Sequence, residues 1–310
     1  MWSDAVVLRK AIYSLGLAQH PPLGRVVSRV ERGCTLINWS MRGPTAPDFP
    51  DSDSSLARDD APALPEIPPR GVVGAAVGPI MWATDQLSAL HILTDQVAHT
   101  MPFNHHAASF MSLCRTAFEC SSQAIWVMSS PDREIRRRRA AGMSLANVGD
   151  AKRYLDGEIS LALGRGEPGP TLERDEVQGW IAELNRLGPQ SAKPTARVIA
   201  AGRWIQDNSP PHLAAEIGSR PIGLLVEQQY NVCSSFSHGE TWPATLVGGD
   251  ISSMFSMMAD AIAVAVYVTE CAVALIEAHA TTTGSTRAIH YPDRLSSTIR
   301  AWQPIYSWTD

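Results

Sequence analysis

The feature that most constrains the fold is a continuous apolar segment, residues 254–276, near the C-terminal end of the chain. It is long enough to cross a bilayer, for which about 20 apolar residues suffice. However, Asp260 and Glu270 lie within it, and a carboxylate at the centre of a membrane costs roughly 3 kcal/mol. A helix that is apolar on every side is typical of the middle of a helical bundle. We therefore expect Ile251–Ala280 to be the long buried C-terminal helix of an all-α, multi-helix bundle, with no membrane contact.

The rest of the chain also has helical periodicity, without the sustained alternation of apolar and polar residues that would indicate a β-strand. Prolines and glycines divide the apolar stripes into separate segments, as they do at helix ends. The expected helices of the bundle span residues 73–100, 104–129, 131–163, 172–187, 195–207, 222–238 and 251–280.

The two ends of the chain differ from the bundle in composition. Residues 42–70 are rich in Pro, Asp and Ser, so they bury too little apolar surface to offset the entropy lost on ordering. Helices are expected before them, at 4–17 and 23–39, and a short helix after the bundle, at 293–302. The predicted organisation is N-terminal helices at 1–41, a disordered linker at 42–70, a helical bundle at 71–280 and a C-terminal tail with a short helix at 281–310.

Charge and cysteine content narrow the classes of function. The formal net charge is -5 at pH 7, which excludes a protein that is basic overall and binds polyanions over its whole surface. The five cysteines are scattered, with no CxxC pair, as is typical of reduced thiols in a cytoplasmic protein. Only 18% of residues are charged, and the chain has nine Trp and ten Met. This composition suggests either much buried surface within one chain or a helical interface with a second copy, and we expect a homo-oligomer.

The helix expected at 104–129 carries a polar row beside its apolar stripe, formed by Arg115, Glu119, Ser122 and Trp126. An Arg and a Glu four residues apart share one helix face. Beside so much apolar surface both charges are expected to be at least half buried, and buried charges need partners. Two interpretations stay open. One is a structural ion pair between helices. The other is a polar pocket that holds the phosphate or carboxylate of a ligand.

The helix expected at 222–238 carries a second polar row. Glu227, Tyr230, Ser234 and His238 fall on one strip of this helix, which should end where Gly239 follows His238. The helix macrodipole favours a protonated His at a helix C-terminus. This suits a general acid or a cation that binds phosphate, and it also simply stabilises the helix.

The densest positive charge in the chain is a run of arginines, which consists of Arg136, Arg137, Arg138 and Arg139. Guanidinium groups on several faces of one helix cannot all be buried together. The run is therefore either a solvated helix surface or a contact with RNA, DNA or a nucleotide.

The sequence lacks the usual catalytic and cofactor signatures. It contains no GxSxG, Walker A loop, GxGxxG after a strand, HExxH or CxxC pair. The row of His91, Asp95 and His99 has ligand types that zinc accepts, but it shares its strip with Thr84 and Ser88 and reads as a solvated helix face. We therefore expect no metal and no cofactor.

Two short motifs resemble a known group of proteins. The residues that carry the resemblance are Arg115, Glu119 and Trp126 on one helix, and Tyr230, Ser234, His238 and Gly239 at the end of another. Over residues 104–280 the chain resembles uncharacterised all-helical bacterial proteins that are distantly similar to HEPN domains and abortive-infection proteins. HEPN ribonucleases carry an Arg a few residues before a His on the same helix, and here no Arg precedes His238 in that way. Only His238 matches, unless Arg115 supplies the guanidinium from its own helix.

These features predict a helical binding or regulatory protein with a polar pocket for an anionic or nucleotide-like ligand, linked by the resemblance to stress or phage defence. The candidate ligand-binding residues are Arg115, Glu119, Tyr230, Ser234 and His238. One alternative is a metal-independent ribonuclease, in which His238 acts as acid or base and Arg115 stabilises charge on the phosphate. The other alternative is a structural homodimer without catalytic activity.

Overall fold

The computed structural model describes residues 21–60, 71–100 and 106–306, with the side chains of 96–100 left out. Every regular element within these ranges is a helix, so the predicted all-α class is confirmed. The helix expected at 4–17, the first residues of the helix expected at 104–129 and the side chain of His99 lie outside what the structure describes. The start of α6 follows His106, which adopts a left-handed backbone conformation with φ 48°.

The seven helices expected for the bundle are present with bounds shifted by a few residues, whereas the helix expected at 23–39 is divided into two and three short α-helices within the described residues were not expected. The bounds of the helices are α2 Pro21–Cys34, α3 Ile37–Arg42, α4 Ser55–Asp60, α5 Gly71–Thr100, α6 Ala107–Met128, α7 Arg133–Arg165, α8 Thr171–Arg186, α9 Pro194–Asp207, η1 Pro211–Leu213, α10 Ala214–Ile217, α11 Ile222–Ser237, α12 Trp242–Val247, α13 Ile251–Ala280, η2 Asp293–Leu295 and α14 Ser296–Tyr306. Side chains account for several starts and stops. Asp132 accepts hydrogen bonds from the Glu134 and Ile135 N–H groups at the start of α7, and Asp250 does the same for Ser252 and Ser253 at the start of α13.

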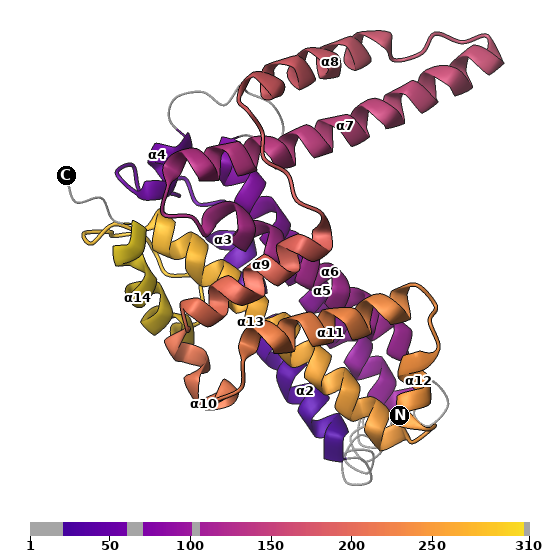
Figure 1. The fold of residues 1–310 in the computed structure, drawn as a ribbon, viewed down its shortest axis with the longest axis vertical. Helices are drawn as coiled ribbons and strands as arrows, with labels where there is room; N and C mark the ends of the chain where they lie inside the picture. The colour runs from indigo at the N-terminus through magenta and orange to yellow at the C-terminus, as the bar shows by residue number, and fades with distance from the viewer. Residues whose placement is uncertain (1–20, 61–70, 101–105, 307–310) are drawn as a thin grey trace, which may run out of the picture.

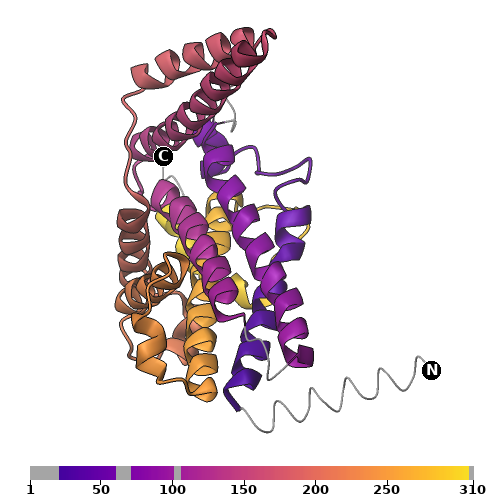
Figure 2. The same ribbon diagram turned by 90° about the vertical axis from the view of Figure 1, so that its right-hand side faces the viewer.

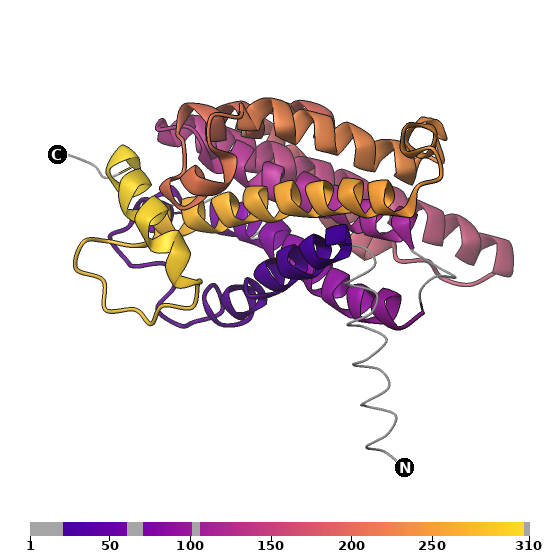
Figure 3. The same cartoon turned by 90° about the horizontal axis from the view of Figure 1, so that it is seen from below.

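The centre of the bundle is α13, as predicted (Figure 1). It packs against α2, α5, α6, α11 and α14, and the view from below places it between α2 and α11 (Figure 3). Within the described residues it is the one helix long and apolar enough to cross a membrane, and 89% of that apolar window is buried. Such burial is typical of the core helix of a soluble protein.

A long helical hairpin, made of α7 and α8, extends from one end of the bundle (Figures 1 and 2). The base of α7 packs against α4, α5 and α6. Farther out, α7 and α8 cover each other through a small apolar cluster of their own that includes Val148, Val177 and Leu184. The arginine run lies at the base of the hairpin, where α7 meets the bundle.

The prediction of a disordered linker is wrong for residues 42–60. This segment contains α4, in which Leu56 and Asp59 are buried, and its carboxylates find partners far away in the chain. Asp51 accepts hydrogen bonds from the hydroxyl groups of Thr282 and Ser285 and from Arg287. These distant partners, which composition does not reveal, offset the cost of ordering a segment so rich in Pro, Ser and Asp. Residues 61–70 of the expected linker lie outside the described ranges.

The N-terminal helices and the C-terminal tail are both attached to polar residues of α13. Glu270 is completely buried, and its carboxylate accepts hydrogen bonds from Arg32 of α2 and from Arg294 of the tail. About two turns later on the same helix, Glu277 accepts hydrogen bonds from the Trp39 indole N–H and from Arg287. Each buried carboxylate is thus paired with one group from either end of the chain.

Glu270 makes the stability of the folded state depend on pH in the acidic range. Burial alone would raise the pKa of its carboxyl, but hydrogen bonds from His212 and Arg32, and the charges of Arg32 and Arg294, lower that pKa to about 2. The ordinary value is 4.5. A carboxyl with a lowered pKa stabilises the folded state above its ordinary pKa, and this contribution disappears as the pH falls through its folded-state pKa.

We predict that Glu270→Gln removes this dependence. Between about pH 5 and about pH 2, the free energy of unfolding of the wild type should fall by about 3 kcal/mol more than that of the variant. Urea unfolding at a series of pH values, followed by circular dichroism, measures both curves. Parallel curves for the two proteins would show that Glu270 is not an ionised, paired group in the folded state.

Candidate functional site

The two candidate catalytic residues, Arg115 and His238, lie in direct contact. Arg115 is on α6 and His238 is the C-cap of α11, and the two helices pack side by side. Nη1 of Arg115 lies 3.1 Å from Nε2 of His238. Because a guanidinium can only donate, His238 accepts this bond through an unprotonated Nε2. Sequence spacing could not show this contact, since the residues are far apart in the chain.

Glu119 joins Arg115 to a third residue of the predicted set. Its Oε1 accepts a hydrogen bond from Nε of Arg115 at 3.0 Å and another from the Tyr230 hydroxyl at 2.8 Å. The side chains of Arg115 and Glu119 are 24% and 29% exposed, so both are more than half buried, as their position beside the apolar stripe predicts. We refer to Arg115, Glu119, Tyr230 and His238 as the Arg115 cluster.

The surroundings shift the ionisation of the cluster. Burial raises the pKa of the Tyr230 hydroxyl, and the neighbouring Glu119 charge raises it further, so this hydroxyl stays a hydrogen-bond donor. Burial lowers the pKa of Arg115, but the hydrogen bond and charge of Glu119 outweigh burial and raise it overall. The ring of Phe118 contacts Tyr230 edge-on, with the centroids 6.4 Å apart, and this contact helps to fix the phenol in place.

Arg197 of α9 is a further cation near Glu119 that the sequence patterns did not single out. Its Nη1 donates to the Ala192 carbonyl at 3.2 Å, while its Nε is buried without a hydrogen-bond partner. Burial lowers the pKa of Arg197, although the charge of Glu119 opposes this. Arg197 belongs to a third helix, and its charged neighbour at helical spacing is Lys193, another cation, so periodicity gives no reason to pair Arg197 with Arg115 and Glu119.

Ser234, the fifth predicted ligand-binding residue, is attached less directly. It is half-buried on α11, and its backbone carbonyl accepts the N–H of His238 at 3.0 Å. Within the described residues no hydrogen bond joins its hydroxyl to the Arg115 cluster. The helix ends where expected, because Gly239 takes the left-handed conformation with φ 74°.

The Arg115 cluster reaches the surface at His238, whereas Tyr230 is buried beneath it. His238 and its neighbour Ser237 are exposed, and the Ser237 hydroxyl lies 3.2 Å from that of Ser112 on α6. A ligand could therefore reach the guanidinium and the imidazole directly from solvent. The cluster offers cationic, donor and acceptor groups within one small area.

The arginine run has mainly structural contacts. The prediction that Arg136 contacts nucleic acid is wrong, because its side chain is 1% exposed and forms a bidentate ion pair with the buried Asp59. Arg138 donates to the Gly188 carbonyl, and Arg139 donates to the Trp126 carbonyl and lies over the Trp126 ring. Arg137 is half-buried, 3.8 Å from Glu134. The run separates onto different faces of α7, and each face finds its own partner.

The described residues contain no group of three or more His, Cys, Asp or Glu side chains placed to hold a metal ion. Comparisons of the chain with protein-family models, with curated proteins and with solved structures found no match. Any functional conclusion for this chain therefore comes from its own geometry.

We predict that Tyr230 and Glu119 stabilise the fold jointly. Tyr230→Phe removes a hydrogen bond to a carboxylate and should lower the free energy of unfolding by about 1–2 kcal/mol. In a double-mutant cycle with Glu119→Gln, the coupling energy should be about 1 kcal/mol. Tyr154→Phe is the matched control, because Tyr154 is 67% exposed and should change stability little. Additive effects of the two substitutions in chemical denaturation would contradict the hydrogen bond.

Proposed function

We propose that this chain binds an anionic, nucleotide-like ligand at the Arg115 cluster. The observation that carries the proposal is the 3.1 Å contact between Arg115 and His238, which places a guanidinium and an imidazole from two helices on one accessible surface. A guanidinium has five N–H donors in a plane, and the bonds to Glu119 and His238 use only part of them. The remaining donors suit the oxygens of a phosphate or carboxylate.

The charges of the site favour an anion in spite of Glu119. Arg115 and Arg197 are both within electrostatic reach of this carboxylate, so two guanidinium groups face one negative charge. The unsatisfied Nε of Arg197 is a further donor whose desolvation is costly without a partner. In this proposal Arg115 contacts the anion, Glu119 orients Arg115, the Tyr230 hydroxyl holds Glu119 in place, and Ser234 and His238 form the rim of the site.

The role that we propose is that of a binding or regulatory protein of the cytoplasm, with stress or phage defence as the setting suggested by the HEPN-like resemblance. Its five cysteines are all free thiols, which supports a reducing compartment. Large apolar side chains at the surface, such as Met41 at 69% and Trp82 at 65% exposure, support assembly into a homo-oligomer.

The same contact favours one alternative, a metal-independent ribonuclease. An unprotonated His238 Nε2 beside a guanidinium is the combination of base and cation that cleavage of a phosphodiester requires. His238 would release Arg115 and take the proton of the RNA 2′-hydroxyl as that oxygen attacks phosphorus. The 5′-oxygen would take a proton from water and leave as the 5′-hydroxyl, with a 2′,3′-cyclic phosphate as the other product. Arg115 would stabilise the negative charge that develops on the phosphate oxygens. Here Arg115 and His238 would come from two different helices, whereas HEPN ribonucleases carry their Arg and His on one helix.

We predict that Arg115→Ala and His238→Ala each weaken binding of a fluorescently labelled single-stranded RNA, and of ATP as its competitor, by about tenfold or more, or about 1.4 kcal/mol. Arg203→Ala is the matched control, because it removes the same charge from an exposed position on α9 outside the cluster. Fluorescence anisotropy at two salt concentrations measures the affinities, and the slope against salt should fall for Arg115→Ala alone.

Gel analysis of the RNA after incubation separates the two candidates. Intact RNA with a binding defect in both variants supports the binding protein. Cleaved RNA, with cleavage lost in His238→Ala, supports the ribonuclease. If wild type and variants bind equally and the substitutions change only the unfolding free energy, the cluster is a structural contact and both functions are wrong.

A further inference from the structure

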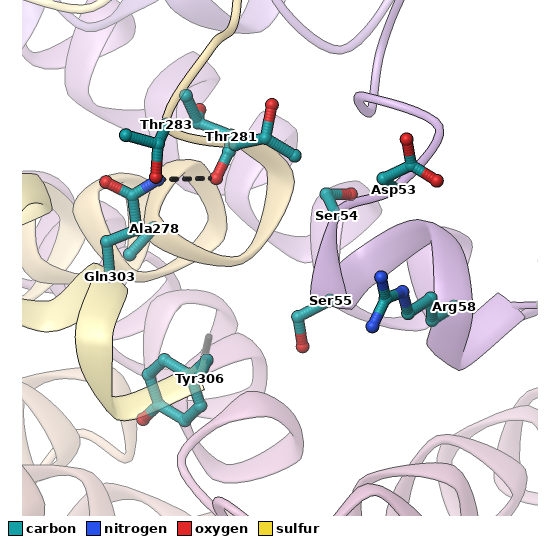
Figure 4. A pocket seen from close by; sticks show the side chains of 10 residues that line it. Asp53, Ser54, Ser55, Arg58, Ala278, Thr281, Thr283, Gln303 and Tyr306 are labelled. Carbon is teal, nitrogen blue, oxygen red and sulfur yellow. Dashed lines mark hydrogen bonds between the residues drawn. The ribbon is translucent and has the colours of Figure 1, made fainter. Parts of the chain in front are cut away.

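A second polar site lies at the opposite end of α13 from its N-cap, where α4 and α14 meet the end of the helix (Figure 4). These elements enclose a cavity of about 140 Å³. Ser55 and Arg58 line it from α4, Thr281 from the end of α13, and Gln303 and Tyr306 from α14. Figure 4 shows the Arg58 guanidinium extending toward Ser55, with Tyr306 across the cavity. Gln303 is held by a hydrogen bond from its amide to the Thr281 carbonyl.

Ser55, on the wall of this cavity, is hydrogen-bonded to a buried histidine. Its Oγ lies 3.1 Å from Nδ1 of His279, and Nε2 of His279 lies 3.0 Å from the Met128 carbonyl oxygen. A carbonyl only accepts, so the imidazole proton is on Nε2 and the lone pair of Nδ1 faces the Ser55 hydroxyl. The Ser55 hydroxyl, the His279 imidazole and the Met128 carbonyl therefore form a hydrogen-bonded chain, in the order of a nucleophile, a base and a group that orients the base.

Two further contacts favour this arrangement. Arg136 donates to the Ser55 Oγ through Nη2 at 3.3 Å, which places a positive charge beside an oxygen that would become negative on losing its proton. The imidazole of His279 is stacked on the ring of Tyr306, with the centroids 3.7 Å apart, so its orientation is fixed. Burial, and secondly the charge of Arg136, hold the pKa of His279 well below its ordinary value, so its lone pair is available at neutral pH.

We propose that Ser55 is a nucleophile that accepts the acyl group of a small, polar carboxylic ester bound in this cavity. The Ser55 oxygen forms a bond to the carbonyl carbon while its proton moves to Nδ1 of His279. The bond from carbon to the ester oxygen then breaks, and the departing alkoxide takes that proton and leaves as the alcohol. The product is an ester of Ser55. Water then hydrolyses this ester, which releases the carboxylic acid and restores the Ser55 hydroxyl.

The lining of the cavity determines which esters it can hold. Its volume admits a short acyl group but no long chain. Its wall is formed by hydroxyl groups, the Gln303 amide and, at an exposed edge, the Asp53 carboxylate. Arg58 is exposed at the mouth and supplies positive charge toward the oxyanion that forms during attack. This activity is independent of the Arg115 cluster, because it uses α4 and the ends of α13 and α14.

The test is acetylation of the full chain by p-nitrophenyl acetate, with release of p-nitrophenol followed by absorbance and the modified peptide identified by mass spectrometry. We expect one acetyl group on Ser55, formed at least about tenfold faster than the residual reaction of Ser55→Ala. Ser219→Ala is the matched control, since Ser219 is exposed and is not part of the cavity wall, and it should react like the wild type.

Thermal unfolding of each variant checks that it is folded. If Ser55→Ala does not fold, the proposal is tested only by which residue of the wild type carries the acetyl group in the peptide map. Acetyl on Ser55 supports the proposal, and acetyl only on lysine, tyrosine or other serines overturns it. A folded Ser55→Ala that reacts as fast as the wild type also overturns it. Neither result changes the expectation for RNA or ATP at Arg115.

Discussion

The fold depends on three polar side chains that α13 buries within its apolar surface. Glu270, Glu277 and His279 are each at most 3% exposed, and a buried charge or polar group without a partner costs several kcal/mol. His279 also contacts the Met128 carbonyl of α6 within the bundle, but several partners of these groups come from outside it. Arg32, Trp39 and Ser55 come from the N-terminal segment, and Arg287 and Arg294 from the tail. The apolar helix can therefore be buried only when both ends of the chain pack onto it.

This constraint positions both candidate sites. His279 can bond Ser55 only because α4 is attached to the end of α13, where the pair of Asp59 and Arg136 also joins α4 to α7. The Arg115 cluster depends on the other side of the bundle, since α6 and α11 both pack on α13 and on each other. Glu119 then fixes Arg115 and Tyr230 through one carboxylate oxygen, so the surface on which His238 meets Arg115 is preorganised by packing below it.

The sequence predicted the local features well and the distant ones poorly. The end of α11 followed from Gly239, because a C-terminal cap acts within one turn. The ion pair of Arg115 and Glu119 followed from helical spacing. The contact of Arg115 with His238 did not, since spacing within a helix does not say which helices pack together. Composition made residues 42–60 look disordered for the same reason: the partners of its acidic residues, Arg136 and Arg287, lie far along the chain.

Hydrogen exchange measured by mass spectrometry tests most directly whether the ends and the bundle form one folded unit. The structure predicts that peptides from 21–60 and from 286–306 are protected, and that with added denaturant they lose protection in the same step as peptides from α13. Rapid exchange of either end while α13 stays protected would contradict the account. Glu270 and Glu277 would then be buried without the partners that the structure gives them, and Ser55 would not be held against His279.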